Sequence, residues 1–247
     1  MTNKPYLSVV IPAYNESRRI PLTLIDIDKH LSTVNYSYEI IVVNDGSTDD
    51  TAQVVERFMK MIPNLRLVGY DKNIGKGNAV RVGMLEAKGK YRLFMDADNS
   101  TSVDQFENMI KYFEEGYDVV ICSRSHKESK LTPAQGGLRS LLGKGGNLFI
   151  QILVLPGIWD TQCGFKAFSD TAAEKVFKLQ RISGWGFDVE ILALAKRFGY
   201  KIKQIPVVWV NDTDSRVGAS AYVSTLIETL RIRYWLWRGA YNIKNNL

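Results

Sequence analysis

Cysteine is nearly absent from this sequence, and long hydrophobic runs are absent altogether. Only Cys122 and Cys163 occur in 247 residues, too few for a disulfide scaffold, so a reducing cytosol is the expected compartment. No stretch reaches the ~18 apolar residues of a membrane-spanning helix, and the first residues lack a signal-peptide pattern. We therefore expect a protein that is soluble or bound peripherally to a membrane.

Low-complexity segments, internal repeats and extreme charge are also missing. Hydrophobic residues make up 45% and charged residues 23% of the chain, which excludes disordered and fibrous classes. The length suits one sizeable α/β domain or two small ones. A net charge of +6 fits an anionic partner such as a phosphate-bearing substrate or a membrane surface, although solubility alone would explain it. The basic residues form no long stripe, so no nucleic-acid partner is expected.

Short β-rich runs alternate with helical patterns through the first hundred residues. This alternation predicts an α/β fold with a Rossmann-like, mostly parallel central sheet flanked by helices. The predicted strands are 7–12, 39–43, 65–69 and 91–95, and the predicted helices are 17–31, one capped by Ser47 or Thr48, and 77–87.

The second half is less regular. We expect a main domain over 1–220 and a C-terminal amphipathic helical segment over 221–247. The glycine-rich basic segment 126–146 is predicted to be a mobile loop over the cleft. The remaining predicted elements are a strand at 117–122, a helix at 187–198 and an edge strand at 203–210.

Three polar clusters follow predicted strands, at 12–16, 44–47 and 96–98. Ligands bind beyond the carboxyl ends of parallel strands, so the three clusters should share one cleft. Asp96 and Asp98, separated by Ala97, could hold Mg²⁺ or Mn²⁺ against a diphosphate, because these ions prefer oxygen ligands and share substrate phosphates. A polar turn is the alternative.

The other two clusters offer groups for a nucleoside. The Asp45 carboxylate could accept hydrogen bonds from a base or ribose, or form an Asx-turn or helix cap. Tyr14 offers a stacking face and Glu16 a ribose acceptor. Lys76 lies in a glycine-containing segment without P-loop spacing; it could reach a diphosphate or be a solvated turn lysine. Arg124, at a strand end, could form a phosphate fork.

These motifs resemble those of family 2 glycosyltransferases, which have the GT-A fold. The resemblance rests on residues 8–16 (SVVIPAYNE), 43–49 (VNDGSTD) and 96–98 (DAD). Within that family, residues 160–166 (DTQCGFK), 75–81 (GKGNAVR) and 187–190 (FDVE) are similar to those of enzymes that glucosylate, or more distantly mannosylate, dolichyl phosphate.

The resemblance implies an inverting, metal-dependent transfer of a hexose, with glucose from UDP-glucose onto a polyprenyl (dolichyl-type) phosphate as the favoured pair. Mannosyl transfer from GDP-mannose, a hydroxyl acceptor, and a non-catalytic binding module remain alternatives. A lipid phosphate has a second pKa of ~6, so it is largely anionic at neutral pH and needs no general base, whereas a hydroxyl acceptor would need one. The implied roles are nucleoside binding by Pro12, Tyr14, Glu16 and Asp45, metal and diphosphate binding by Asp96 and Asp98, phosphate binding by Arg124, and lipid-phosphate binding by Arg139, Lys144 and Arg216.

Departures from the family pattern concern Asn44, where aspartate is frequent, and Asn99, where glycine is frequent. Gly218-Ala219-Ser220 lacks the lysine that usually completes that motif. Asp160 is assigned to the catalytic site, where it could orient a sugar hydroxyl or a loop cation; a structural role is the alternative for it and for Asp188.

The C-terminal helix combines aromatic and basic residues. Trp235, Trp237 and Tyr241 alternate with arginines, a composition that suits a membrane headgroup layer. We therefore expect a cytoplasmic enzyme, peripheral at the cytosolic face of a membrane. Core packing or a dimer contact is the alternative for this helix.

Overall fold

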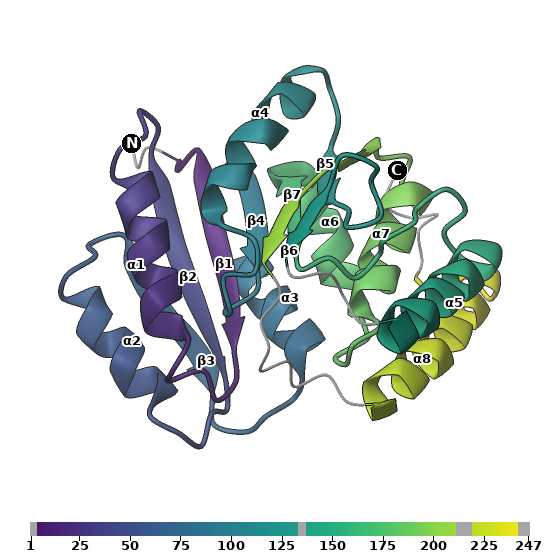
Figure 1. Ribbon diagram of the computed structural model, residues 1–247, viewed down its shortest axis with the longest axis horizontal. Helices are drawn as coiled ribbons and strands as arrows, with labels where there is room; N and C mark the ends of the chain where they lie inside the picture. Colours follow the sequence, from purple (N-terminus) through teal and green to yellow (C-terminus); the bar gives the residue numbers. More distant parts are fainter. Residues whose placement is uncertain (1–3, 133–136, 211–218, 242–247) are drawn as a thin grey trace.

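A seven-stranded sheet forms the centre of the computed structural model, which describes residues 4–132, 137–210 and 219–241 (Figure 1). The strand order is β3-β2-β1-β4-β7-β5-β8. The strands are β1 (Leu7–Ala13), β2 (Tyr38–Asp45), β3 (Leu65–Tyr70), β4 (Tyr91–Met95), β5 (Val119–Cys122), β7 (Phe165–Ser169) and β8 (Ile202–Ile205).

Helices cover both faces of this sheet. The strands are buried on both sides, so neighbouring residues of one strand belong to different cores: Val9 and Ile11 face one, and Val10 faces the other. The first face is covered by α1 (Ile20–Leu31), α2 (Thr51–Met59), η1 (Val103–Phe106) and α4 (Glu107–Glu114). The second is covered by α3 (Lys76–Glu86), α6 (Asp170–Leu179) and α7 (Phe187–Arg197).

The α/β class is confirmed, and the sheet is mostly parallel as predicted. Strands β1 to β4 pair in parallel, and so do β5 and β8. Strand β7 is the exception, because it lies antiparallel between β4 and β5. Strand β7 was not predicted from the sequence, where residues 160–166 stand out as a motif and not as a strand pattern. The chain enters β7 from the carboxyl edge of the sheet, which brings residues 160–164 to the cleft.

The prediction of a mobile loop over 126–146 was wrong. This segment contains a short strand, β6 (Lys130–Thr132), and the start of a long helix, α5 (Gly137–Leu153). Glycine disfavours helix, but Ile150 of α5 packs in the core, as do Val154 and Leu155 directly after the helix, and this packing offsets that cost. The predicted edge strand divides at Pro206, so that β8 joins the main sheet while β9 (Val208–Val210) pairs with β6.

Helix α8 (Ala219–Trp237) packs beside α5 and α7 (Figure 1). The predicted boundary at residue 220 therefore falls within its first turn. After the helix, Tyr241 is buried and donates a hydrogen bond to Glu190 at 2.7 Å. Within the described ranges, none of the helices has both the length and the apolar character needed to span a bilayer.

The prediction that Ser47 or Thr48 caps α2 was also wrong. The helix begins at Thr51, and its N-cap Asp50 makes no side-chain cap hydrogen bond. The Ser47 hydroxyl instead accepts a hydrogen bond from the Asn15 amide at 3.0 Å, and the Asn15 side chain accepts one from the Thr48 amide at 2.8 Å. These contacts join the ends of β1 and β2 beside the cleft.

Candidate active site

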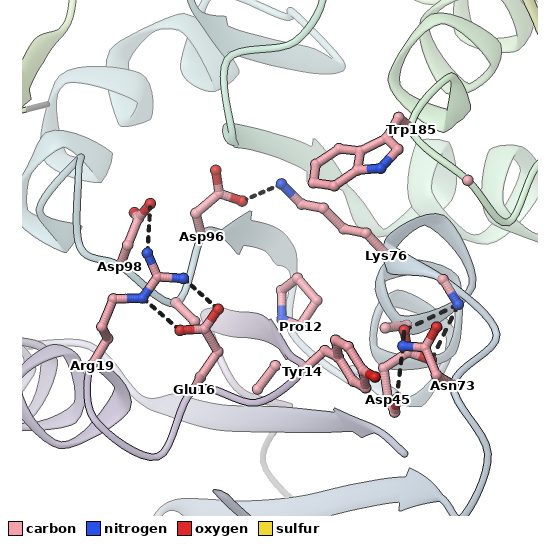
Figure 2. A pocket seen from close by; sticks show the side chains of 15 residues that line it. Pro12, Tyr14, Glu16, Arg19, Asp45, Asn73, Lys76, Asp96, Asp98 and Trp185 are labelled. Carbon is pink, nitrogen blue, oxygen red and sulfur yellow. Dashed lines mark hydrogen bonds and ion pairs between the residues drawn. The ribbon is translucent and has the colours of Figure 1, made fainter. Parts of the chain in front are cut away.

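The three predicted polar clusters meet in one cavity at the carboxyl ends of β1, β2 and β4 (Figure 2). Its volume is about 300 Å³, within the range of small-ligand sites. The cavity is lined by Pro12, Ala13, Tyr14, Glu16, Arg19, Asp45, Asn73, Gly75, Lys76, Ala79, Asp96, Ala97, Asp98, Gly184 and Trp185.

The Asp96–Asp98 turn is held from several sides. The Ala97 carbonyl accepts a hydrogen bond from the Thr23 hydroxyl at 2.7 Å, and the Asp98 carboxylate accepts one from the Ser100 amide at 3.0 Å. Asn99 has φ +54°, a left-handed conformation that glycine and asparagine adopt most readily. The structure thus accounts for asparagine at a position where glycine is frequent.

Gly164 leaves the space that the Asp96 carboxylate occupies. A Cβ atom at Gly164 would lie 2.0 Å from Asp96 Oδ2 and 2.3 Å from its Cγ. The Gly164 carbonyl also accepts a hydrogen bond from the Asp96 amide at 3.2 Å. The glycine of the 160–166 motif is therefore a direct neighbour of the acidic pair.

Two cations face the two carboxylates (Figure 2). Lys76 Nζ lies 2.5 Å from Asp96 Oδ1, and Arg19 Nη1 lies 4.0 Å from Asp98 Oδ2. Burial raises the pKa of Asp98, and the nearby Asp96 charge raises it further. Burial opposes the charge on Lys76, but the attraction of Asp96 and Asp188 outweighs it and raises the Lys76 pKa.

The residues present fit a hard divalent cation that shares its ligands with a substrate. Asp96 Oδ1 is buried, and among the described residues the Lys76 ammonium faces it as an ion-pair partner. Among the described residues, no group of three or more His, Cys, Asp or Glu forms a protein-only metal cage. Two carboxylates at a cavity wall suit Mg²⁺ or Mn²⁺ bound jointly with phosphate oxygens and water.

The predicted nucleoside end contains Tyr14, Glu16 and Asp45. Tyr14 is 42% exposed, which leaves ring surface available for stacking. The Glu16 carboxylate accepts two hydrogen bonds from the Arg19 guanidinium, at 2.6 and 2.5 Å. Asp45 is buried and accepts from the Asn73 side chain at 2.8 Å and the Gly75 amide at 3.0 Å. Asp45 therefore shapes this wall by ordering residues 73–75.

Asp160 is paired with Arg124. The Arg124 guanidinium donates to both Asp160 oxygens, at 2.8 and 2.9 Å, and its backbone amide adds a third bond at 2.8 Å. Asp160 is 1% exposed; burial raises its pKa, but Arg124 outweighs this and lowers it. Because Arg124 occupies both Asp160 oxygens, this geometry fits a role in orienting a cation, or a structural role, better than contact with a sugar hydroxyl.

A second buried pair lies behind the cavity. Lys166 is fully buried and donates to Asp188 at 2.6 Å and to the Cys163 carbonyl at 2.5 Å. Burial raises the pKa of Asp188 in spite of Lys166 and Lys76. Neither Lys166 nor Asp188 lines the cavity, which fits the structural role considered for Asp188.

Sequence reasoning missed Arg19, Asn73 and Trp185 as cavity residues. Arg19 lies three residues after Glu16, a helical spacing that could have revealed the pair. Trp185 comes from a distant segment of the chain, and nothing local marks it. Arg139 and Lys144 lie on α5, with side chains beyond what the structure describes, and Arg216 lies outside the described residues.

Comparisons with known proteins agree with this geometry. The family model described as "Glycosyl transferase family 2" matches residues 8–177. Dolichyl-phosphate beta-glucosyltransferase of Dictyostelium discoideum is 38% identical over 253 residues, which cover 97% of this chain and 77% of the relative. The enzyme of the same name from Saccharomyces cerevisiae is 39% identical over 222 residues, covering 83% of this chain and 66% of the relative.

Solved structures share the fold. Glucosyl-3-phosphoglycerate synthase from Mycobacterium tuberculosis, in complex with Mn²⁺, UDP and glucosyl-3-phosphoglycerate, superposes with a TM-score of 0.69 at 23% identity, covering 93% of this chain and 80% of that one. A mannosyltransferase from Pyrobaculum calidifontis in complex with GDP-Man and Mn²⁺ gives 0.60 at 21% identity, covering 94% and 64%.

The mixed sheet, its helical layers and the acidic pair at the carboxyl end of β4 define a glycosyltransferase of the GT-A fold. The chain belongs to glycosyl transferase family 2.

Proposed function

We propose that this enzyme transfers glucose from UDP-glucose to a dolichyl-type polyprenyl phosphate with inversion at the anomeric carbon. The observation that carries the proposal is the cavity that joins Asp96 and Asp98 to Tyr14, Glu16 and Asp45. It is supported by the name that the relatives share, at 31–39% identity.

Charge placement in the cavity suits departure of a diphosphate. Asp96 and Asp98 would hold Mg²⁺ or Mn²⁺, which would neutralise negative charge on the leaving group. Lys76, at the N-terminus of α3, is close enough to the acidic pair to contact the same phosphates. Pro12 and Tyr14 supply the apolar wall for the base, and Glu16 a carboxylate for the ribose.

The acceptor needs positioning by cations and no general base, because a phosphate monoester is largely anionic at neutral pH. Arg124 is fixed in one orientation by Asp160, and its guanidinium also lies 5.0 Å from the Trp209 ring. We assign Arg124 to the phosphates, and Arg139, Lys144 and Arg216 to the acceptor phosphate.

The test is a transfer assay with purified protein, dolichyl phosphate and Mn²⁺ or Mg²⁺. We expect glucosyl lipid from UDP-glucose, much less product from GDP-mannose, and none in the presence of a chelator. Transfer to a soluble hydroxyl acceptor but not to the lipid phosphate would refute the acceptor assignment. Product from GDP-mannose alone would refute the donor.

Replacing Gly164 with alanine should reduce transfer about a hundredfold, because displacing a catalytic group by ~1 Å can have that effect. The new Cβ would overlap the Asp96 carboxylate, which can rotate away without unfolding the protein. Initial rates and thermal unfolding measure the two consequences. Gly145→Ala is the matched control, since a Cβ there meets nothing within 4 Å. Equal rates for the two variants would show that Asp96 does not need its present position.

We further propose that α8 contacts an anionic membrane surface. Its exposed apolar residues recur every three or four positions and so form one stripe, consisting of Val223, Ile227, Leu230, Tyr234 and Trp237. Exposed arginines flank the stripe, with Arg231 and Arg238 on one side and Arg233 on the other. Leu148 and Ile152 of the adjacent α5 are also exposed. Apolar residues with a cationic rim suit anionic headgroups.

The structure corrects one part of the prediction that the aromatic residues near the C-terminus meet a membrane. Trp235 does not face outward with Trp237, because it packs against the core and forms an edge contact with Tyr241 at 6.1 Å between ring centroids. Trp237, in contrast, is 75% exposed. Only Trp237 of these three aromatic residues is therefore available for insertion.

Binding to phosphatidylserine vesicles should be measurable by co-sedimentation at low salt and should fall as salt rises, because each interfacial arginine contributes ~1 kcal/mol that salt screens. Trp237→Ser should weaken binding several-fold. Met61→Ser, at an exposed apolar residue beyond the far end of α2, is the control and should bind normally. No binding at low salt would leave α8 as a packing or dimer helix.

A further inference from the structure

Helix α8 contains one acidic residue, Glu228, and this residue contacts the turn that carries the cavity residues Gly184 and Trp185. The Glu228 carboxylate accepts a hydrogen bond from the Gly186 amide at 2.6 Å. A Cβ at Gly184 would lie 2.5 Å from Glu228 Oε1, and one at Gly186 would lie 2.7 Å from Glu228 Cβ. The two glycines thus allow the backbone of this turn to lie directly against the glutamate.

The other side of the same turn holds the N-terminus of α3. The Ser183 carbonyl accepts hydrogen bonds from the Gly77 amide at 2.8 Å and the Asn78 amide at 3.3 Å. A Cβ at Gly75 would lie 2.5 Å from the Ser183 oxygen. Residues 182–186 are therefore fixed between Glu228 and the segment that begins α3.

Trp185, at the centre of the turn, reaches the cavity (Figure 2). The Lys76 ammonium lies 5.5 Å from the centre of its ring, within the range of a cation–π interaction. The turn is also tied to α8 through Gln162, whose side-chain amide donates to the Trp185 carbonyl and to the Thr225 hydroxyl, both at 3.4 Å.

We propose that Glu228 is a positioning residue for the donor: from α8 it holds the 182–186 turn so that Trp185 stays beside Lys76 at the acidic pair. This inference rests on the proposed function only in requiring that the cavity binds a nucleoside diphosphate. Because the outer face of α8 carries the exposed stripe, the same contact links that surface to the donor cavity.

The test is calorimetric titration of UDP with Mn²⁺ into the protein of 247 residues, without acceptor or membrane. Glu228→Ala should raise the Kd of UDP about tenfold, since one charge-assisted hydrogen bond is lost and the turn is freed. Glu228→Gln keeps an oxygen that can accept from Gly186 and should stay within about threefold of the wild type. Glu56→Ala, at an exposed glutamate of α2, is the matched control and should bind normally.

A double-mutant cycle separates positioning from general stabilisation. In a Trp185→Ala background, Glu228→Ala should change the Kd of UDP little, because the residue through which it acts is gone. Thermal unfolding of each variant, measured in parallel, shows that the protein titrated is folded. Binding by Glu228→Gln within about threefold of the wild type, together with this non-additivity, supports the proposal.

Three results would overturn it. Glu228→Ala could lower the melting temperature and leave the Kd of UDP unchanged, which is the behaviour of a residue that only anchors α8. The effects of Glu228→Ala and Trp185→Ala could add in full, or Glu228→Gln could bind as weakly as Glu228→Ala. Failure of the wild type itself to bind UDP would refute the proposed function instead.

Discussion

Asp98→Asn should lower the rate of transfer by about 10³-fold, the scale on which removal of one preorganised electrostatic contact acts on a transition state. Asparagine keeps the size of the side chain and an oxygen that can accept from the Ser100 amide, so the turn should keep its shape. It removes one of only two carboxylates at the proposed metal site. The free energy of unfolding should change little, because the site is a cavity wall and not a packed core.

Initial rates with UDP-glucose and dolichyl phosphate measure the first effect, and electron paramagnetic resonance of Mn²⁺ with UDP measures loss of metal binding directly. Asp50→Asn, at an exposed aspartate before α2, is the matched control and should keep full activity. Turnover near that of the wild type in Asp98→Asn would remove Asp98 from the metal site.

The location of the site was predictable because it follows from topology. Strands β1, β2 and β4 are parallel, and their carboxyl ends share one edge, so residues far apart in sequence had to meet there. Local patterns were sufficient to identify these strands. Strand β7 was not predicted, because its direction depends on where the chain returns to the sheet, and no feature of residues 165–169 encodes that.

The partners of the site residues were harder to predict than their presence. Asp45 was selected as a polar group at a strand end and Asp160 as part of the 160–166 motif; Asp45 lines the cavity and Asp160 does not. Asp45 accepts from residues 73–75 and Asp160 from Arg124, contacts that depend on loops of no regular pattern. Trp185 reaches the cavity from the turn before α7, and Glu228 contacts that turn from α8, so only the tertiary structure reveals them.

Asp160→Asn should lower the free energy of unfolding by ~3 kcal/mol, because breaking a buried ion pair at one partner leaves the other charge uncompensated. This loss is at the low end of the range for breaking a buried ion pair, because the Arg124 side chain is 26% exposed and can gain some hydration. The asparagine side chain is close in size to the aspartate that it replaces, so cavity formation should contribute little. Denaturant unfolding at neutral pH measures the loss.

The pH dependence of this loss identifies its cause. Arg124 holds the pKa of Asp160 below its ordinary value, so the pair stabilises the folded state above ~3.9, the pKa of an unfolded aspartate. That stabilisation disappears as pH falls through the lower, folded-state pKa. The difference in the free energy of unfolding between wild type and Asp160→Asn should therefore narrow on acidification below about pH 4.

Arg124→Gln combined with Asp160→Asn should recover part of the stability, because no uncompensated charge remains. Asp71→Asn, at an exposed position, should change stability by less than about 0.5 kcal/mol. A loss that is independent of pH and unchanged in the double variant would show that the Arg124–Asp160 ion pair is not its source.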